Sequence, residues 1–461
     1  MFKLITVIKL SENRVFRRPL LVALFIVTMH PLRAQSRLDE YIQEGLSSNQ
    51  SIKQQTFMLD KNVYALKEAK SMFLPDVSFL TTYTKADGGR TIDFPTGDLL
   101  NSAYATLNQL TGTNSFPQLK NQRILLNPDN FYDAKFRTTL PILNAELIYN
   151  KRIKLQQVDL QKAEVLLYKR ELVKEIKTAY YNYVKAINAT EIYKSSLRLV
   201  EEGQRINTAL FNNSKVNRTA VIRSTNEVSK INASLIAATK TAESARYYFN
   251  FLLNRSSADS ILLDDIIELP KQDYLPADNV SGREELAKLR IAKDINSNLN
   301  GLAKSYLIPK IGTYLDLGSQ AFNWQFDNHS RYYFWGVSLE WNLFSFGKNS
   351  YKIKQTIAGR QSIEAQTDYV EQQLTTELKV RQNEMQSTVA EYNAAQSELK
   401  TAQTYYDDVL KLYKEGMVIY IELLDAQNQL INARLNANIA LFDTWISHAA
   451  VERANASFNI Q

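Results

Sequence analysis

Two long stretches without glycine or proline, residues 142–202 and 360–414, constrain the fold of this 461-residue chain more than any other feature. Glycine and proline are the residues that most disfavour a helix. At about 1.5 Å per residue, each stretch predicts a helix roughly 80–90 Å long. A globular helix seldom runs so far, and such lengths are typical of coiled-coil-like packing.

Apolar residues recur along both stretches at steps of 3, 4 or 7, as coiled-coil-like packing requires. The second stretch carries the longer seam, which includes Ile363, Val370, Leu374, Leu378, Met385, Val389, Tyr406, Val409 and Tyr413. The first carries Val173, Ile176, Tyr180, Tyr183 and Ile187. We therefore expect a mainly helical protein whose long helices pack against one another.

Four shorter segments, at about 77–85, 132–140, 310–320 and 332–342, are predicted as strands. In the fourth segment Tyr333, Trp335, Val337, Leu339 and Trp341 share one face, which is the period of a strand. Each is about 9–11 residues long, enough for a tilted strand to cross a bilayer. Trp335 and Trp341 are candidates for the lipid-facing aromatic girdles of a membrane barrel. An ordinary half-buried strand would show the same alternation.

The chain repeats its own order of helix, strand, loop, strand, long helix, break and helix. The first repeat is predicted at 35–267, a linker at 268–281 and the second repeat at 282–461. Leu140 corresponds to Trp341 at an offset of 201, and Phe211 to Tyr413 at an offset of 202. The extra length of the first repeat lies in residues 86–131, whose glycines and prolines predict a surface loop.

Residues 1–34 have the features of an export signal. Arg14, Arg17 and Arg18 precede an apolar stretch, Leu20 to Met29, and Ala34 offers a small residue for cleavage. The apolar stretch is too short to span a bilayer as a helix. A buried helix or a membrane anchor is the alternative.

Composition excludes several classes of function. The 55 Lys and Arg and 48 Asp and Glu alternate in sign, which argues against a nucleic-acid partner. The chain has no Cys, and His30, His329 and His448 lack the spacing of metal ligands. We expect no metal and no cofactor. Because no nucleophile elbow or phosphate loop occurs, we do not expect an enzyme.

The ordered features resemble the TolC-like outer-membrane efflux family, the outer membrane factors of tripartite efflux and type I secretion systems. The resemblance covers about residues 36–455. It is carried by the duplicated layout, by the strand-to-helix corners TTLPILNAEL and LEWNLFSFGK, and by the stretch YKEGMVIYIELLDAQNQLINARL. The second corner fits the family pattern in part, whereas the first, Leu140 to Glu146, lacks its glycines.

The resemblance implies a homotrimer in the outer membrane of a Gram-negative cell. Each subunit would give four strands to a 12-stranded β-barrel, continued by a long α-helical barrel in the periplasm, with 86–131 as an extracellular loop. Four strands alone are too few to close a barrel. The family's members are passive exit ducts that dock onto a periplasmic adaptor and an inner-membrane pump. Small-molecule efflux is the first expectation and type I protein secretion the second; a non-pore periplasmic scaffold is the alternative from another class.

The resemblance also assigns two hairpin turns at the periplasmic tip, at 211–221 and 414–421. Candidate adaptor contacts are Gly416, Met417, Val418, Ile419 and Tyr420 in one turn and Ser214, Lys215, Val216, Asn217 and Arg218 in the other. Gly416 permits a left-handed backbone at the reversal, while Ser214 stands where the family has glycine. The apolar run Met417 to Ile421 would pack neighbouring tips together or meet an adaptor.

Glu422 and Asp425 lie one helical turn apart and so share a face. The family pattern places acidic residues here, facing the lumen, so a trimer would carry a ring of six carboxylates that favours cations and raises some carboxyl pKa values. Solvated charges near a helix N-terminus are the alternative. The first-repeat counterparts are Ala220 and Arg223. Lys215, Arg218 and Arg223 could reach acidic residues of a neighbouring tip.

Overall fold

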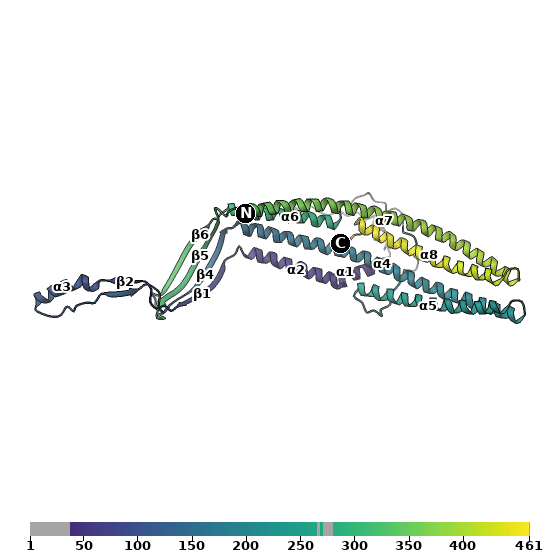
Figure 1. Cartoon of the computed structure of the whole chain (residues 1–461), viewed down its shortest axis with the longest axis horizontal. Coiled ribbons are helices and arrows are strands. Elements are labelled where there is room, and N and C mark those ends of the chain that lie inside the picture. The colour runs from purple at the N-terminus through teal and green to yellow at the C-terminus, as the bar shows by residue number, and fades with distance from the viewer. Residues whose placement is uncertain (1–36, 265–267, 271–279, 461) are drawn as a thin grey trace, which may run out of the picture. The chain divides into compact units, whose positions relative to one another are not determined.

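A computed structural model describes residues 37–264, 268–270 and 280–460 (Figure 1). The predicted export signal and most of the predicted linker lie outside the described residues. Contacts divide the chain into two compact units. The helical unit takes the described residues within 1–49, 171–274 and 383–450, and the sheet unit takes those within 50–170, 275–382 and 451–461.

Two helices are far longer than the others: α4 (Ala145–Asn212) has 68 residues and α7 (Lys348–Lys414) has 67. Each is followed, after a short turn, by a helix of 35 residues, α5 (Arg218–Leu252) or α8 (Tyr420–Ala454). Figure 1 shows α5 running back along α4 and α8 running back along α7. The matched lengths agree with the offset of about 202 residues.

Small and branched side chains hold these helices together in the helical unit. Val200, Ile231 and Ile431 bring α4, α5 and α8 into one cluster. The shorter helices of the chain are α1 (Arg37–Ser48), α2 (Gln50–Ser71), α3 (Thr96–Thr111), α6 (Glu284–Lys304) and the 3-10 helix η1 (Ser305–Leu307). Within the described part of the chain, no helix combines the length and the apolar character needed to cross a membrane.

Four strands form one antiparallel sheet in the sheet unit, in the order β1-β4-β5-β6. They are β1 (Asp76–Thr84), β4 (Phe131–Leu143), β5 (Lys310–Phe322) and β6 (Arg331–Glu340). β4 pairs with β5 from Phe131 opposite Phe322 to Leu143 opposite Ile311, with a register shift at Pro141. The central pair runs past the predicted ends, whereas β6 stops one residue before Trp341. β1 and β6 each keep one unpaired edge within the chain.

The segment at 86–131, predicted as a loop, carries secondary structure of its own. It contains a two-stranded ladder, β2 (Thr91–Phe94) with β3 (Gln122–Leu125), and the helix α3 between them. Gly112, which the sequence suggested as a loop residue, is the left-handed C-cap of α3, with φ at 67°. The segment therefore contains secondary structure that the prediction of a surface loop did not include.

A buried ion network ties the start of α6 to the end of α8 in the sheet unit. Glu285 accepts hydrogen bonds from Arg283 at 2.7 Å and from Arg453 at 2.9 Å. Both guanidinium groups are almost fully buried. Burial by itself would raise the pKa of the Glu285 carboxyl, but hydrogen bonds from the two arginines outweigh it and lower this pKa from 4.5 to about 2.

This network predicts an acid-dependent loss of stability that Glu285→Gln removes. The folded pKa is depressed, so the stabilisation is complete above pH 4.5 and is lost as the pH falls towards about 2. At neutral pH the substitution should lower the free energy of unfolding by roughly 2–3 kcal/mol, because two buried cations lose their shared carboxylate while Arg283 keeps Glu377 and the Ala454 carbonyl.

Thermal unfolding followed by helical circular dichroism, in detergent between pH 7 and pH 2.5, measures both effects. Glu371→Gln, at an exposed position of α7, is the matched control and should change neither. Equal pH dependence of the midpoint in the wild type and Glu285→Gln would contradict the account.

Candidate functional site

The two turns of the helical unit close with the same pattern of backbone hydrogen bonds. In the second turn the Gly416 N–H donates to the Tyr413 carbonyl at 3.0 Å, and Met417 N–H donates to Leu412 at 2.9 Å. In the first, Ser214 donates to Phe211 at 2.9 Å and Lys215 to Leu210 at 2.8 Å. Both are Schellman C-caps, and every partner is displaced by 202 residues between them.

The left-handed residue is a glycine in one cap and a serine in the other. Gly416 has φ at 77° and Ser214 has φ at 57°. A residue with a Cβ is strained in this region, whereas glycine is not. The prediction that Gly416 adopts the left-handed conformation is confirmed, and Ser214 adopts it without the glycine.

The apolar run after Gly416 divides into two sets. Val418 and Tyr420 face the helical unit and pack into a cluster with Tyr413, Leu423 and Ala426. Met417, Ile419 and Ile421 are exposed, Met417 by 69% and Ile419 by 64%. The expected packing therefore holds within the chain for one set only. Val216 of the first turn lies against the same cluster, so both turns share one apolar core.

This core also contains a polar contact that sequence reasoning missed. The Tyr413 hydroxyl donates to the Asn207 Oδ1, and Asn207 is fully buried. Burial raises the pKa of the nearby Tyr420 hydroxyl to about 12. A signal was present, because Asn207 follows Val200 by seven residues and so puts a polar side chain on the apolar seam.

Glu422 and Asp425 lie on the exposed side of α8 in the single chain. The Asp425 carboxylate accepts a hydrogen bond from Gln429 at 2.7 Å. Of the first-repeat counterparts, Ala220 is buried in the shared core and Arg223 is exposed. Among the described residues none pairs ionically with Lys215, Arg218 or Arg223, which leaves three cations exposed beside the turns. Asn217 caps α5 by accepting a hydrogen bond from the Ala220 N–H.

The sheet has one face of charged and tyrosine side chains. Arg137 of β4 makes a bidentate ion pair with Asp316 of β5, at 2.7 and 2.6 Å. Lys135 donates to Asp133 at 2.7 Å, and Tyr332 of β6 donates to the same carboxylate. Two cations thus balance two carboxylates on this polar face.

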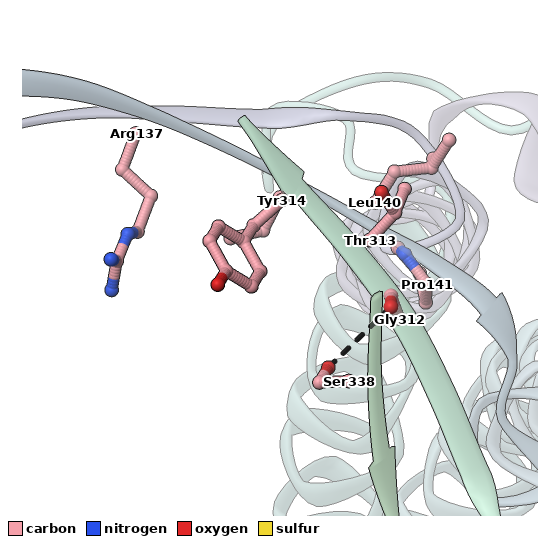
Figure 2. Close-up of a pocket in the computed structure, with 8 residues that line it drawn as sticks. Arg137, Leu140, Pro141, Gly312, Thr313, Tyr314 and Ser338 are labelled. Atoms are coloured by element: carbon pink, nitrogen blue, oxygen red, sulfur yellow. Dashed lines mark hydrogen bonds between the residues drawn. The ribbon is translucent and has the colours of Figure 1, made fainter. Parts of the chain in front are cut away.

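An open pocket of about 430 Å³ lies at one end of the polar face (Figure 2). Figure 2 shows Arg137 and Tyr314 projecting to the same side, with Ser338 donating to the Gly312 carbonyl at 3.5 Å. The Arg137 guanidinium lies 5.5 Å from the centre of the Tyr314 ring. That ring covers Gly336, where an added Cβ would stand 2.7 Å from the Tyr314 Cζ. The glycine is needed because the aromatic ring occupies the space above it.

The opposite face of the sheet is apolar and exposed in the single chain. Tyr333, Trp335, Val337 and Leu339 alternate out of β6 on this face, and Trp335 is 68% exposed. Trp341 follows the strand and is also exposed. In a neighbouring apolar pair, the rings of Phe79 of β1 and Phe136 of β4 pack at a tilt of 49° with their centres 5.0 Å apart. Exposed apolar area of this extent marks an interaction surface.

Among the described residues, no group of three or more His, Cys, Asp or Glu is placed to hold a metal ion.

Residues 277–455 match the sequence model of the family "Outer membrane efflux protein". No curated protein sequence matches the chain.

Several solved structures share the fold. The outer-membrane channel OprN superposes with a TM-score of 0.74 at 15% identity, over 92% of this chain and 90% of that one. VceC from Vibrio cholerae gives 0.72 at 14%, over 91% and 96%. The CmeC outer membrane channel from Campylobacter jejuni gives 0.73 at 14%, over 92% and 86%. The prediction that the chain is not an enzyme is confirmed, because the matched family is one of efflux proteins and two of these structures, OprN and CmeC, are outer-membrane channels.

The matched turns predict opposite effects of glycine exchange on stability. Ser214→Gly should raise the free energy of unfolding by about 1 kcal/mol, because it relieves a strained left-handed residue. Gly416→Ala should lower it by about 1 kcal/mol through strain alone, since nothing lies within 4 Å of the added Cβ. Urea unfolding of the two variants measures both. Changes of the same sign would contradict the assignment of the two caps.

Proposed function

We propose that this chain, whose residues 277–455 belong to the outer membrane efflux protein family, forms an exit duct across the outer membrane of a Gram-negative cell. One observation carries the proposal: a sheet with an exposed apolar face, a charged face and two unpaired edges. Lipid can cover the apolar face, and water can fill the space against the charged face. Unpaired strand edges cannot face lipid, so other copies must complete the sheet.

A homotrimer is the assembly that this proposal requires. Four strands from each of three copies give a 12-stranded barrel, which lies within the range of membrane barrels. Trp335 in β6 and Trp341 just after it then stand towards the lipid at different heights, as interfacial aromatic residues do. The long helices would continue the duct on the periplasmic side. A non-pore periplasmic scaffold accounts for the helices but leaves the apolar face of the sheet without a partner.

The turns are the proposed contact with a periplasmic adaptor and its inner-membrane pump. Met417 and Ile419 are exposed apolar side chains at the second turn, and Lys215 and Arg218 are exposed cations at the first. The two turns are shaped by Gly416, Val418 and Tyr420 in the second and by Ser214, Val216 and Asn217 in the first. Exposed apolar groups rimmed by charge are typical of protein contact sites. Export of small molecules is the proposed activity, with type I protein secretion as the second candidate.

Glu422 and Asp425 are the proposed selectivity ring of the duct. Both carboxylates are exposed on α8, within two helical turns of its start. Three copies would place six carboxylates around one axis, and such rings favour cations over anions.

Single-channel conductance in planar bilayers tests the pore and the ring together. We expect cation-selective events blocked by divalent cations in the wild type. Glu422→Gln with Asp425→Asn should lower the selectivity and relieve the block several-fold, because the ring loses six charges. Glu391→Gln with Glu398→Gln removes the same charge from exposed positions of α7 and is the matched control.

Each outcome of this recording decides a different part of the proposal. A pore that behaves alike in all three forms would remove Glu422 and Asp425 from the selectivity ring and keep the duct. Well-folded oligomers that give no channels would contradict the duct itself.

A further inference from the structure

The insertion module, residues 86–130 between β1 and β4, contains β2, α3 and β3 and has two exposed apolar faces. Its base is fastened to the end of the sheet. Lys85 pairs with Asp129 at 2.8 Å, and the Asn130 amide donates to Asn323 at 2.5 Å. Just past the module, the Tyr132 ring stacks on Trp324 at 5.4 Å. The module is therefore held where β1, an edge strand, leaves the sheet (Figure 1).

The inner face of α3 is satisfied by hydrogen bonds to the segment that follows it. Asn101 accepts from the Leu119 N–H at 2.7 Å and donates to the Leu119 carbonyl at 2.9 Å. Asn108 makes the same two contacts with Phe116, at 3.0 and 2.8 Å. Because these amides fix the rotation of the helix, the residues on its other side are turned away from the module.

That outward side is a leucine stripe, which consists of Leu99, Leu100, Ala103, Leu107 and Leu110. Leu100, Ala103, Leu107 and Leu110 follow one another at steps of 3, 4 and 3, the spacing of a helix–helix seam. All five are exposed, Leu110 by 78%. Leu99 is 63% exposed, and Leu100 and Leu107 are each 39% exposed, so the described chain covers the stripe only in part.

The β2–β3 ladder also has one polar face and one exposed apolar face. Asp93 and Arg123 pair across one face at 2.8 Å, while Ile92 lies opposite Ile124 on the other face, next to Phe94. Ile92, Phe94 and Ile124 are each about half exposed. A two-stranded ladder is marginal in water unless another layer covers its apolar face. Two elements of one module thus lack a covering layer.

We propose that the leucine stripe packs against the same stripe of other copies of this chain, an inference that rests on the proposed trimer. The place of the module beside the free edge of β1 favours another copy of the chain as the partner of the stripe. The free edge of β1 must pair with another copy, so the interface that closes the sheet brings neighbouring modules together. Asp98 is the one charged residue of α3, and it is bound by the Asn121 amide at 2.8 Å. Identical stripes therefore meet without charge repulsion.

Cysteine cross-linking tests the contact in the full-length protein in native membranes. The chain has no Cys, so a single introduced thiol reports on its own position. Leu110→Cys lies in the stripe, and Gln109→Cys lies beside it on α3 but outside the stripe. Oxidation should yield roughly tenfold more disulfide dimer for Leu110→Cys, because the bond needs Cα atoms about 4.4–6.8 Å apart.

A second pair of variants gives a measurement that does not need disulfide geometry. Leu107→Asp with Leu110→Asp should make the insertion module at least several-fold more sensitive to external protease, while Ser102→Asp with Gln109→Asp leaves it protected. Like charges would then separate the stripes.

Three results would overturn the inference. One is a Leu110→Cys thiol that reacts with a bulky maleimide as fast as Gln109→Cys in intact trimers, since the stripe would then be open to solvent or to a different protein. Another is quenching of a bimane label at residue 110 by brominated lipid, since the stripe would then face the membrane. The third is unchanged protease sensitivity in the Leu107→Asp, Leu110→Asp variant. Loss of trimers and of conductance in the wild type would instead overturn the proposed function.

Discussion

The unpaired backbone edges of β1 and β6 are the constraint on which the proposed assembly depends. Each edge carries N–H and C=O groups that need partners, and a hydrocarbon surrounding supplies none. The apolar face of β6, with Trp335 and Leu339, prevents the sheet from resting in water alone. In the proposed assembly, other copies of the chain pair with the two edges and lipid covers the apolar face. The ion pairs on the polar face, such as Arg137 with Asp316, balance its charges, which suits the water-filled interior of the proposed barrel.

Length and reversal define the helical unit. α4 and α7 continue for 68 and 67 residues because no proline interrupts them and each contains a single glycine, Gly203 in α4 and Gly359 in α7. Each ends in a Schellman cap that returns the chain. The left-handed residue is Ser214 in one cap and Gly416 in the other. The first turn therefore keeps the same geometry without the glycine that this conformation favours. The shared core with Tyr413 and buried Asn207 joins the two turns into one structure.

The sequence predicted the elements that follow a period and missed those that depend on contacts between distant residues. Alternation identified β4 and β6, β1 and β5 were predicted as segments that each follow a proline, and seven-residue steps identified α4 and α7. α3 was missed although Leu100, Ala103, Leu107 and Leu110 have helical spacing, because the glycines and prolines on both sides of it favour a loop. The hydrogen bonds of Asn101 and Asn108, which hold α3 in the module, leave no pattern in the sequence. The cover of Tyr314 over Gly336 depends on strand register. The apolar run after Gly416 passes from a turn into α8. For this reason Val418 packs into the core while Met417 stays exposed.

Accessibility of spin labels along β6 tests the central claim most directly. Single cysteines from residue 332 to 339, in full-length protein reconstituted in lipid, report collisions with oxygen, which concentrates in lipid, and with a water-soluble nickel chelate. Gly336 is left unlabelled because the Tyr314 ring covers it. The account predicts a period of two: labels at 333, 335, 337 and 339 meet oxygen, and labels at 332, 334 and 338 meet the chelate. Labels that meet the chelate alike on both faces would contradict a lipid-facing sheet and favour a scaffold without a pore.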